Sequence, residues 1–419
     1  MNTLSVILAA ALLAAFLLNV AADRLNLAAS RGAVPPELEG IYDEQRYRAS
    51  QRYLQARTQF GWWREGTGLF FLILFWVGGG FAALDRWVRS LGEGSIASGL
   101  IYIGVLVLLR AVLSLPFSVY ATFALERRFG FNRTSWATFV ADRAKSAVLS
   151  FALGLPLLAG VLTLFEHAGQ WAWLWAWAGV SAFALTVQYL APRWILPLFN
   201  TYTPLAEGPL RSAILALAAS VDFPLQQVFV IDGSRRSTKS NAFFTGFGAN
   251  RRVALFDTLV AAHPIAQIVA VLAHEIGHYR RRHIVQGAVL SILQAGLVFF
   301  LFSVALSRPE FSEAFGVRDA STYTGLACLA VVYAPLDLVI GALTAAISRR
   351  NEYQADRFAV GATRDGQALI EALRALSAHN LANLTPHPLY VALNYSHPPL
   401  RERFAAIREA QRLLKPRAS

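Results

Sequence analysis

The sequence contains very little cysteine and few charged residues. Cys328 is the only cysteine, which excludes an intramolecular disulfide framework and a zinc site made of several thiolates. Any metal must therefore be held by histidine and carboxylate side chains. Charged residues make up only 15% of the 419 positions and hydrophobic residues 55%, and the mean hydropathy is +0.43. This composition excludes an ordinary soluble protein.

Basic residues outnumber acidic ones by 38 to 26, which gives a formal net charge of +12. Such a surplus is typical either of a nucleic-acid-binding face or of a membrane protein with basic cytoplasmic loops. No basic run has the aromatic interleaving or motif context of a nucleic-acid reader, so we expect no nucleic-acid partner. Only three of the basic residues are lysines, a usage that resembles that of a GC-rich bacterial genome.

Seven apolar stretches are long enough to cross the roughly 30 Å hydrocarbon layer as helices. The predicted spans are residues 4–22, 68–84, 98–125, 147–165, 171–191, 284–306 and 324–348. The first lacks the basic region that begins a cleaved signal peptide, so we interpret it as a span. The sequence therefore predicts an all-α polytopic membrane protein whose surroundings are the lipid bilayer.

The loops on the two sides of the predicted bundle differ in charge. Linkers 23–67 and 126–146 together carry twelve Arg and Lys residues, whereas the loops that alternate with them carry four. The positive-inside rule then places the N-terminus outside and the C-terminus in the cytoplasm. The membrane would be the inner membrane of a bacterium, or the endoplasmic reticulum membrane in a eukaryote.

This topology divides the chain into four parts. Residues 1–191 hold the first five spans and their loops, 192–283 form a cytoplasmic region, 284–348 hold the last two spans, and 349–419 form a cytoplasmic C-terminal region.

The first cytoplasmic region contains the sequence His-Glu-Ile-Gly-His at 274–278. Two histidines four residues apart on a helix project from one face, so His274 and His278 can reach one zinc ion. Glu275 would lie beside the attacking water as general base. A structural histidine pair is the alternative interpretation of the motif.

A third ligand is predicted from the segment that follows the last span. Glu352 and Asp356 lie one helical turn apart, so Glu352 could complete a His, His, Glu zinc set while Asp356 accepts a hydrogen bond from a ligand histidine. A solvated acidic pair is the alternative. Two antiparallel spans return the chain to one face of the membrane between His278 and Glu352, which favours the zinc site.

Two further segments are candidates for substrate chemistry. His397 precedes two prolines and Arg403 follows two turns later, so these residues could stabilise the oxyanion, although a structural role is more common for such residues. Residues 228–231, 241–247 and 253–256 are predicted strands, with a turn at 248–251. The edge that begins with Asn241, Ala242 and Phe243 could bind an extended peptide as an added strand.

With these motifs in place, the sequence resembles the type I CAAX prenyl proteases, integral-membrane zinc metalloproteases of seven spans. The matching stretches are residues 126–134, 197–200, 232–246, 255–259, 274–278, 352–356 and 396–400. They cover roughly the last three quarters of the chain in the family's order.

The resemblance implies seven helices around a water-filled chamber, with the zinc site facing it from a cytoplasmic domain that contains a small β-sheet. It assigns His274, His278 and Glu352 to zinc, Glu275 to general base and His397 to oxyanion stabilisation. It likewise places Asn241 and Ala242 on the substrate-binding strand and Arg403 close to the site. Eukaryotic members remove the last three residues of proteins with a prenylated C-terminal cysteine, so a peptide or protein substrate of that kind is implied.

Two other functions stay open on the sequence. One is a quality-control zinc protease for membrane proteins, and the other is a seven-span channel or transporter with a structural metal. Arg110 and Asp337 lie within predicted spans and are expected to line the chamber, either as solvated groups or as an ion pair.

Overall fold

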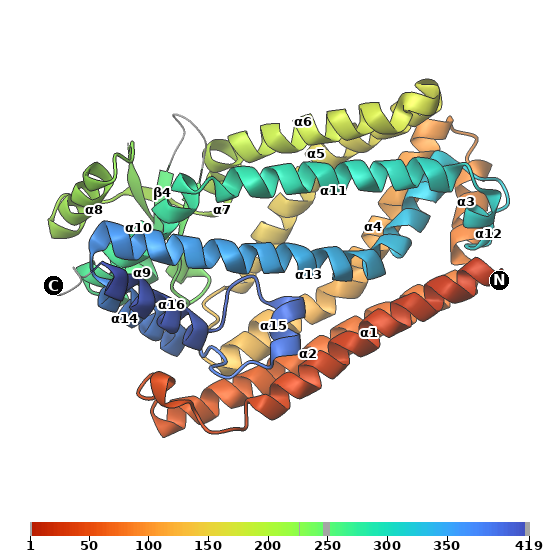
Figure 1. Ribbon diagram of the computed structural model, residues 1–419. Helices are drawn as coiled ribbons and strands as arrows, with labels where there is room; N and C mark the ends of the chain where they lie inside the picture. The colour runs from red at the N-terminus through yellow and green to blue at the C-terminus, as the bar shows by residue number, and fades with distance from the viewer. Residues whose placement is uncertain (1, 226, 246–251, 415–419) are drawn as a thin grey trace.

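The structure, a computed structural model, describes residues 2–225, 227–245 and 252–414. Long helices dominate it and run side by side along the molecule (Figure 1). Six of them are long and apolar enough to cross a membrane: α1 (Thr3–Ala29), α4 (Ser95–Tyr120) continued by the π-helical turn η2 (Ala121–Glu126), α5 (Trp136–His167), α6 (Ala172–Trp194) preceded by the 3-10 turn η3 (Gly169–Trp171), α11 (His283–Leu306) and α13 (Thr322–Thr363). The prediction of a polytopic helical membrane protein is confirmed.

The second predicted span, which would be the seventh in total, is a bent pair of helices. α2 (Glu44–Val77) and α3 (Gly80–Ser90) meet at an angle of 62°, so the predicted straight span 68–84 is interrupted. The break occurs at Gly79, which has φ 73°, a left-handed conformation that glycine adopts without steric cost. A Cβ on Gly80 would lie 2.4 Å from the Phe75 ring, so the bend leaves no room for a side chain there.

A small mixed sheet lies at one end of the helices. Its strands are β1 (Tyr202–Pro204), β2 (Val228–Ile231), β3 (Ala242–Thr245) and β4 (Arg252–Phe256), in the order β1-β2-β4-β3. β2 and β4 are parallel and the other two pairs are antiparallel, with Ala242 opposite Leu255. Three strands were predicted and β1 was not, while the predicted turn at 248–251 lies outside the described residues.

The remaining helices are short. They are η1 (Pro36–Leu38), α7 (Leu196–Phe199), α8 (Pro209–Ser220), η4 (Gly233–Arg235), α9 (Asp257–Ala262), α10 (Ile265–Arg280), α12 (Pro309–Glu313), α14 (Gly366–His379), α15 (Pro388–Asn394) and α16 (Leu400–Leu413). α8, α10, α14 and α16 gather around the sheet (Figure 1). α13 is continuous across the expected boundary between residues 348 and 349, so a span and the C-terminal region share one helix.

Two apolar cores lie at opposite ends of the spans. One, called the catalytic core because it includes the helix that carries the predicted ligands His274 and His278, contains Leu255 on the sheet, Leu272 on α10 and Phe404 on α16, each 0–1% exposed. The distal core contains Trp76, Phe81, Tyr102, Phe315 and Tyr323, where α2, α3, α4 and the α12 region meet the start of α13. The spans therefore join two packed ends.

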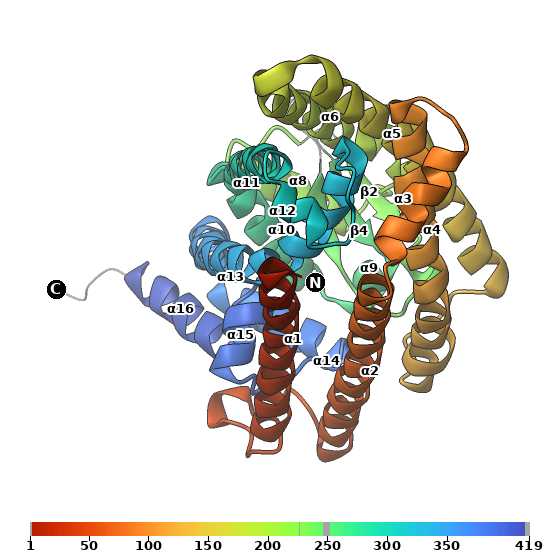
Figure 2. The same cartoon turned by 90° about the vertical axis from the view of Figure 1, so that its right-hand side faces the viewer.

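Between these cores the spans are sparsely packed. In the six unbroken spans, only 6–22% of the most apolar 18-residue segment is buried. Figure 2 shows the spans arranged in a ring when viewed from the α12 end. Every residue of α4 from 107 to 116 is exposed, a run of almost three turns that covers all faces of the helix. Arg110 and Asp337 are both exposed, and no ion pair of the described residues joins them.

Candidate metal centre

α10 carries the two histidines on one face because its other face is apolar. Ile268, Leu272 and Ile276 recur every four residues and are at most 2% exposed, which fixes the rotation of the helix against the catalytic core. Gly277 lies against α13, where a Cβ would meet the Ala355 Cα at 3.0 Å. This close approach brings the face of α13 that carries Glu352 up to His274 and His278.

The predicted ligand residues converge in the structure. The Nε2 atoms of His274 and His278 lie 3.2 Å apart, and they lie 3.4 Å and 3.1 Å from the two carboxylate oxygens of Glu352. One ligand atom from each residue falls within 4.8 Å of the others. Among the described residues this is the one group of three such side chains placed to hold a metal ion.

A second layer of polar groups lies behind these side chains. Asp356 Oδ1 is 2.8 Å from His274 Nδ1, and the Arg403 guanidinium donates to both oxygens of Asp356 at 2.9 Å and 2.6 Å. Burial disfavours the protonated form of His274, but hydrogen bonds to Asp356 and Glu352 outweigh it and raise the pKa of this imidazole to about 9. Arg403 is 7% exposed, so it contacts the ligand layer from inside the fold.

Glu275 and His397 occupy the more open side of the site. Glu275 is partly exposed, and burial of its carboxyl raises the pKa of this group above its ordinary value. His397 lies on the loop before α16, with Nε2 3.5 Å from Glu352 Oε1 and a side chain 64% exposed. Its Nδ1 is 2.9 Å from Ser396 Oγ.

The strand expected to bind substrate is an edge strand. Among the described strands β3 pairs only with β4, and it packs next to α10. Asn241 is exposed, its side chain accepts a hydrogen bond from the Ala242 N–H, and its carbonyl accepts one from the Phe256 N–H. Phe243 packs edge-to-face on Phe256 at 6.3 Å between ring centroids.

One residue that the sequence left unassigned also reaches the site. His283, the first residue of α11, lies with its Nδ1 3.1 Å from His278 Nδ1 and is 8% exposed. The two histidines are five positions apart, so helical spacing gave no signal for this contact. Only the break between α10 and α11 brings them together.

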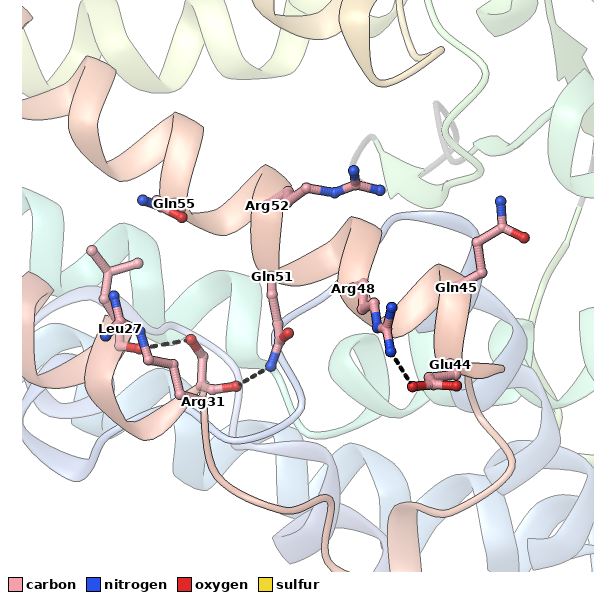
Figure 3. A pocket seen from close by; sticks show the side chains of 9 residues that line it. Leu27, Arg31, Glu44, Gln45, Arg48, Gln51, Arg52 and Gln55 are labelled. Carbon is pink, nitrogen blue, oxygen red and sulfur yellow. Dashed lines mark hydrogen bonds and ion pairs between the residues drawn. The ribbon is translucent and has the colours of Figure 1, made fainter.

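A concavity lies away from these residues, between α1 and α2. It measures about 560 Å³ and is lined by polar side chains that include Arg31, Arg48 and Arg52. Figure 3 shows that these arginines do not point to a common centre, and Arg48 is paired with Glu44. We interpret this concavity as a solvated groove of the α1–α2 hairpin.

Comparison with known proteins agrees with this geometry. Residues 23–201 match the family described as CAAX prenyl protease N-terminal, five membrane helices, and residues 204–411 match peptidase family M48. CAAX prenyl protease 1 of Saccharomyces cerevisiae is 34% identical over 407 residues, which cover 90% of this chain and 89% of the yeast protein. The chain belongs to the CAAX prenyl protease 1 family.

Other members of this family match over similar lengths. The CAAX prenyl protease 1 homolog of Homo sapiens is 32% identical and covers 90% of this chain and 88% of its own. The crystal structure of S. mikatae Ste24p superposes with a TM-score of 0.90 at 32% identity, covering 97% of this chain and 99% of that one. As a CAAX prenyl protease of peptidase family M48, the chain is a multi-pass membrane metalloendopeptidase, and the channel alternative is set aside.

Proposed function

We propose that this CAAX prenyl protease uses one zinc ion to cut a peptide bond near the C-terminus of a prenylated protein. The observation that carries the proposal is the convergence of His274, His278 and Glu352 beside Glu275 and the edge strand β3. The substrate class is supported by the relatives, which are called CAAX prenyl proteases.

The donor set fits zinc. Two imidazoles and one carboxylate are the ligands of hydrolytic zinc sites that keep a further position open. Glu352 Oε2 is buried and accepts no hydrogen bond from the described residues. His274 Nε2 and Arg403 Nη1 lie 3.4 Å and 3.5 Å from it, so it still has lone pairs available to a cation. His274 and His278 have their Nε2 atoms facing each other at 3.2 Å, an arrangement in which a shared cation satisfies both.

The proposed mechanism divides proton transfer and charge stabilisation among the chain's own residues. When bound, zinc supplies a Lewis acid that acidifies a water molecule and polarises the scissile carbonyl. Glu275 accepts the proton of the attacking water on a carboxylate oxygen and passes it to the departing amine. His397, whose exposed ring lies 3.5 Å from Glu352, donates from Nε2 to the developing oxyanion.

Asp356 and Arg403 are proposed to position the ligands. Asp356 accepts the Nδ1 hydrogen of His274, which leaves Nε2 of that ring free for the metal. Arg403 is buried with its guanidinium on Asp356, so it compensates the charge of that carboxylate. These contacts favour a role for Arg403 through Asp356, whereas His397 is the candidate for direct contact with substrate.

β3 is proposed to hold the substrate backbone. Its unpaired edge begins at Asn241, Ala242 and Phe243 and lies beside α10, so an extended peptide could add as a further strand next to Glu275. Whether the peptide pairs with β3 in the parallel or the antiparallel orientation would set the direction in which it binds.

The sparsely packed middle of the spans supports a water-filled chamber. α4 is exposed on every face over residues 107–116. Its outer face would contact lipid, and its inner face, which no other helix covers, would contact water. Arg110 and Asp337 are costly in lipid and are proposed to face this interior. From the basic loops we propose that the metal centre lies at the cytoplasmic surface, in a bacterial inner membrane or an endoplasmic reticulum membrane.

The test compares two peptides of one sequence. Purified protein in detergent is offered a farnesylated CAAX peptide and the same peptide without the lipid. We expect the prenylated peptide to be cut faster, and cleavage to stop on treatment with a chelator and return with zinc. Equal cutting of the two peptides would contradict the prenyl preference and favour a quality-control protease. Cleavage that persists after complete metal removal would overturn the zinc mechanism.

A matched pair of variants identifies the base. Glu275→Ala should abolish cleavage, whereas Glu371→Ala, on α14 and paired with Gln367, should leave it unchanged. Equal activity of these two variants would contradict the role of Glu275.

A further inference from the structure

We infer that His283 is a positioning residue that holds His278 in the tautomer able to bind the metal. This inference rests on the proposed function, because it concerns the same metal site. His283 is 8% exposed and contacts His278, with ring centroids 5.1 Å apart and planes at 73°.

The contact depends on a break in the helix. On a continuous α-helix, five residues rotate a side chain by about 500°, so His283 would point roughly 140° away from His278. Instead α10 ends at Arg280, and Arg282 adopts the left-handed region with φ 58°. This conformation is unfavourable for a residue other than glycine, because its Cβ comes close to the following carbonyl oxygen. It turns the start of α11 so that the His283 ring folds back onto His278.

The ring contacts of His283, with the Gln354 amide oriented as it is here, favour one assignment of the protons. Nδ1 of His278 and Nδ1 of His283 are 3.1 Å apart, so one of them carries the hydrogen. His283 Nε2 is 3.2 Å from Gln354 Oε1, which can only accept. The hydrogen of His283 is therefore on Nε2, and its Nδ1 lone pair accepts from His278 Nδ1–H.

This arrangement leaves His278 Nε2 without a hydrogen on the side where the metal ligands meet. That atom lies 3.1 Å from Glu352 Oε1. A ligand histidine whose other ring nitrogen donates to a fixed acceptor is held in the metal-binding tautomer and orientation. Each ligand histidine then has an acceptor of its own, Asp356 for His274 and His283 for His278.

α13 supplies a residue to the hydrogen bonds of both ligand histidines. Glu352, Gln354 and Asp356 lie on two consecutive turns of this helix and supply, in order, a metal ligand, the partner of His283 and the acceptor for His274. The acceptor on His278 is a neutral imidazole, whereas the acceptor on His274 is a carboxylate. We therefore expect the loss of His283 to weaken metal binding less than the loss of Asp356.

The test measures zinc affinity by competition with a chromophoric chelator in the full-length protein in detergent. His283→Phe keeps the ring volume and removes the acceptor, and its affinity should fall about tenfold, at the lower end of the 10–100-fold range for such partners. His283→Asn places an amide oxygen where Nδ1 was and should stay within about threefold of the wild type. His263→Phe is the matched control, because His263 is similarly buried at 9% and its ring contacts Gln267 rather than a ligand histidine; it should bind zinc as the wild type does.

Two outcomes would overturn the inference. One is a folded His283→Phe protein with wild-type zinc affinity, and the other is a His283→Asn protein that loses as much affinity as His283→Phe. If His283→Phe does not fold, Gln354→Met replaces it as the test, with an expected loss of about threefold, and an unchanged affinity would count against the inference. A wild-type protein that binds no zinc would instead refute the proposed function.

Discussion

Two buried aspartates, each paired with an arginine, lie at opposite ends of the molecule, one in the metal centre and one in the distal core; Arg403 is buried as well, whereas Arg89 is exposed. Asp356 is held by Arg403 through two hydrogen bonds of 2.9 Å and 2.6 Å, and Asp85 by Arg89 through one of 2.9 Å. The third partner differs. Asp356 contacts His274, whereas Asp85 accepts from the Tyr323 hydroxyl at 2.8 Å.

The difference shows that the same local chemistry can orient a ligand or fasten a helix. The distal pair ties α3 to the first turn of α13, far from any reacting group. The pair in the metal centre is the one proposed to keep a metal ligand in one tautomer. The four predictions below test whether the two ends are specialised in this way, beginning with the largest expected effect.

The first prediction concerns the base at the catalytic end. Glu275→Gln should lower kcat/KM by about 10³-fold, because general-base catalysis contributes roughly 10²–10⁴-fold, while zinc stays bound. Asp337→Asn, an acid in the middle of the spans, should change kcat/KM by less than about threefold. Steady-state kinetics with metal analysis of both proteins makes the measurement. Equal losses in both variants would mean that catalysis is not confined to the catalytic end.

The second prediction concerns the replacement of each of the two aspartates by asparagine. Asp356→Asn should weaken zinc binding by about 10–100-fold, because the partner of a ligand histidine loses its charge. Asp85→Asn should lower the thermal midpoint and leave zinc affinity unchanged. Chelator competition and thermal denaturation of the metal-free proteins separate the two effects. A loss of zinc affinity in Asp85→Asn would show that the ends are coupled.

The third prediction uses two helical glycines. A Cβ on Gly277 would meet α13 backbone at 3.0 Å, whereas one on Gly104 of α4 would meet nothing within 4 Å. Gly277→Ala should push α10 away from α13 and weaken zinc binding by about tenfold. Gly104→Ala should leave zinc binding unchanged and keep or raise stability, because alanine favours helix. Similar zinc affinities in the two variants would argue against tight packing at the catalytic end.

The fourth prediction concerns pH. Zinc needs His274 without its proton, and in the metal-free site the carboxylates raise the pKa of this residue to about 9. Between pH 7 and 9, zinc binding should therefore release about one proton, and affinity should rise with pH by less than tenfold per unit. Calorimetry in two buffers of different ionisation enthalpy measures this release. Asp356→Asn should release less, and an affinity independent of pH would contradict the assigned coupling.

Most of the metal centre could be predicted from the sequence because it depends on helical spacing. His274 and His278 are one turn apart, as are Glu352 and Asp356, and the structure keeps each pair on one helix. The topology of two antiparallel spans was sufficient to bring the pairs together. The roles of Asn241, His397 and Arg403 remain proposals, since the structure gives their positions and not their contacts with substrate.

Features that depend on backbone breaks could not be predicted in this way. His283 reaches His278 only because Arg282 leaves the helical conformation, and nothing in the spacing indicates that. The second span is bent at Gly79. A span is predicted from the average hydropathy of a segment, and that average does not show a break inside the segment. β1 has only three residues and ends in proline, too short for an alternating pattern, and its pairing with β2 comes from the tertiary fold.

Because α13 is continuous, it fixes the distance between the end of its membrane span and the metal ligand Glu352. The apolar stretch of this helix ends near Ser348, and Glu352 follows one turn later, about 6 Å along the axis at 1.5 Å per residue. An extended peptide advances about 3.3 Å per residue, so this offset equals about two residues of substrate. A substrate anchored at the membrane surface would therefore need about two extended residues between its anchor and the scissile bond to reach the metal centre.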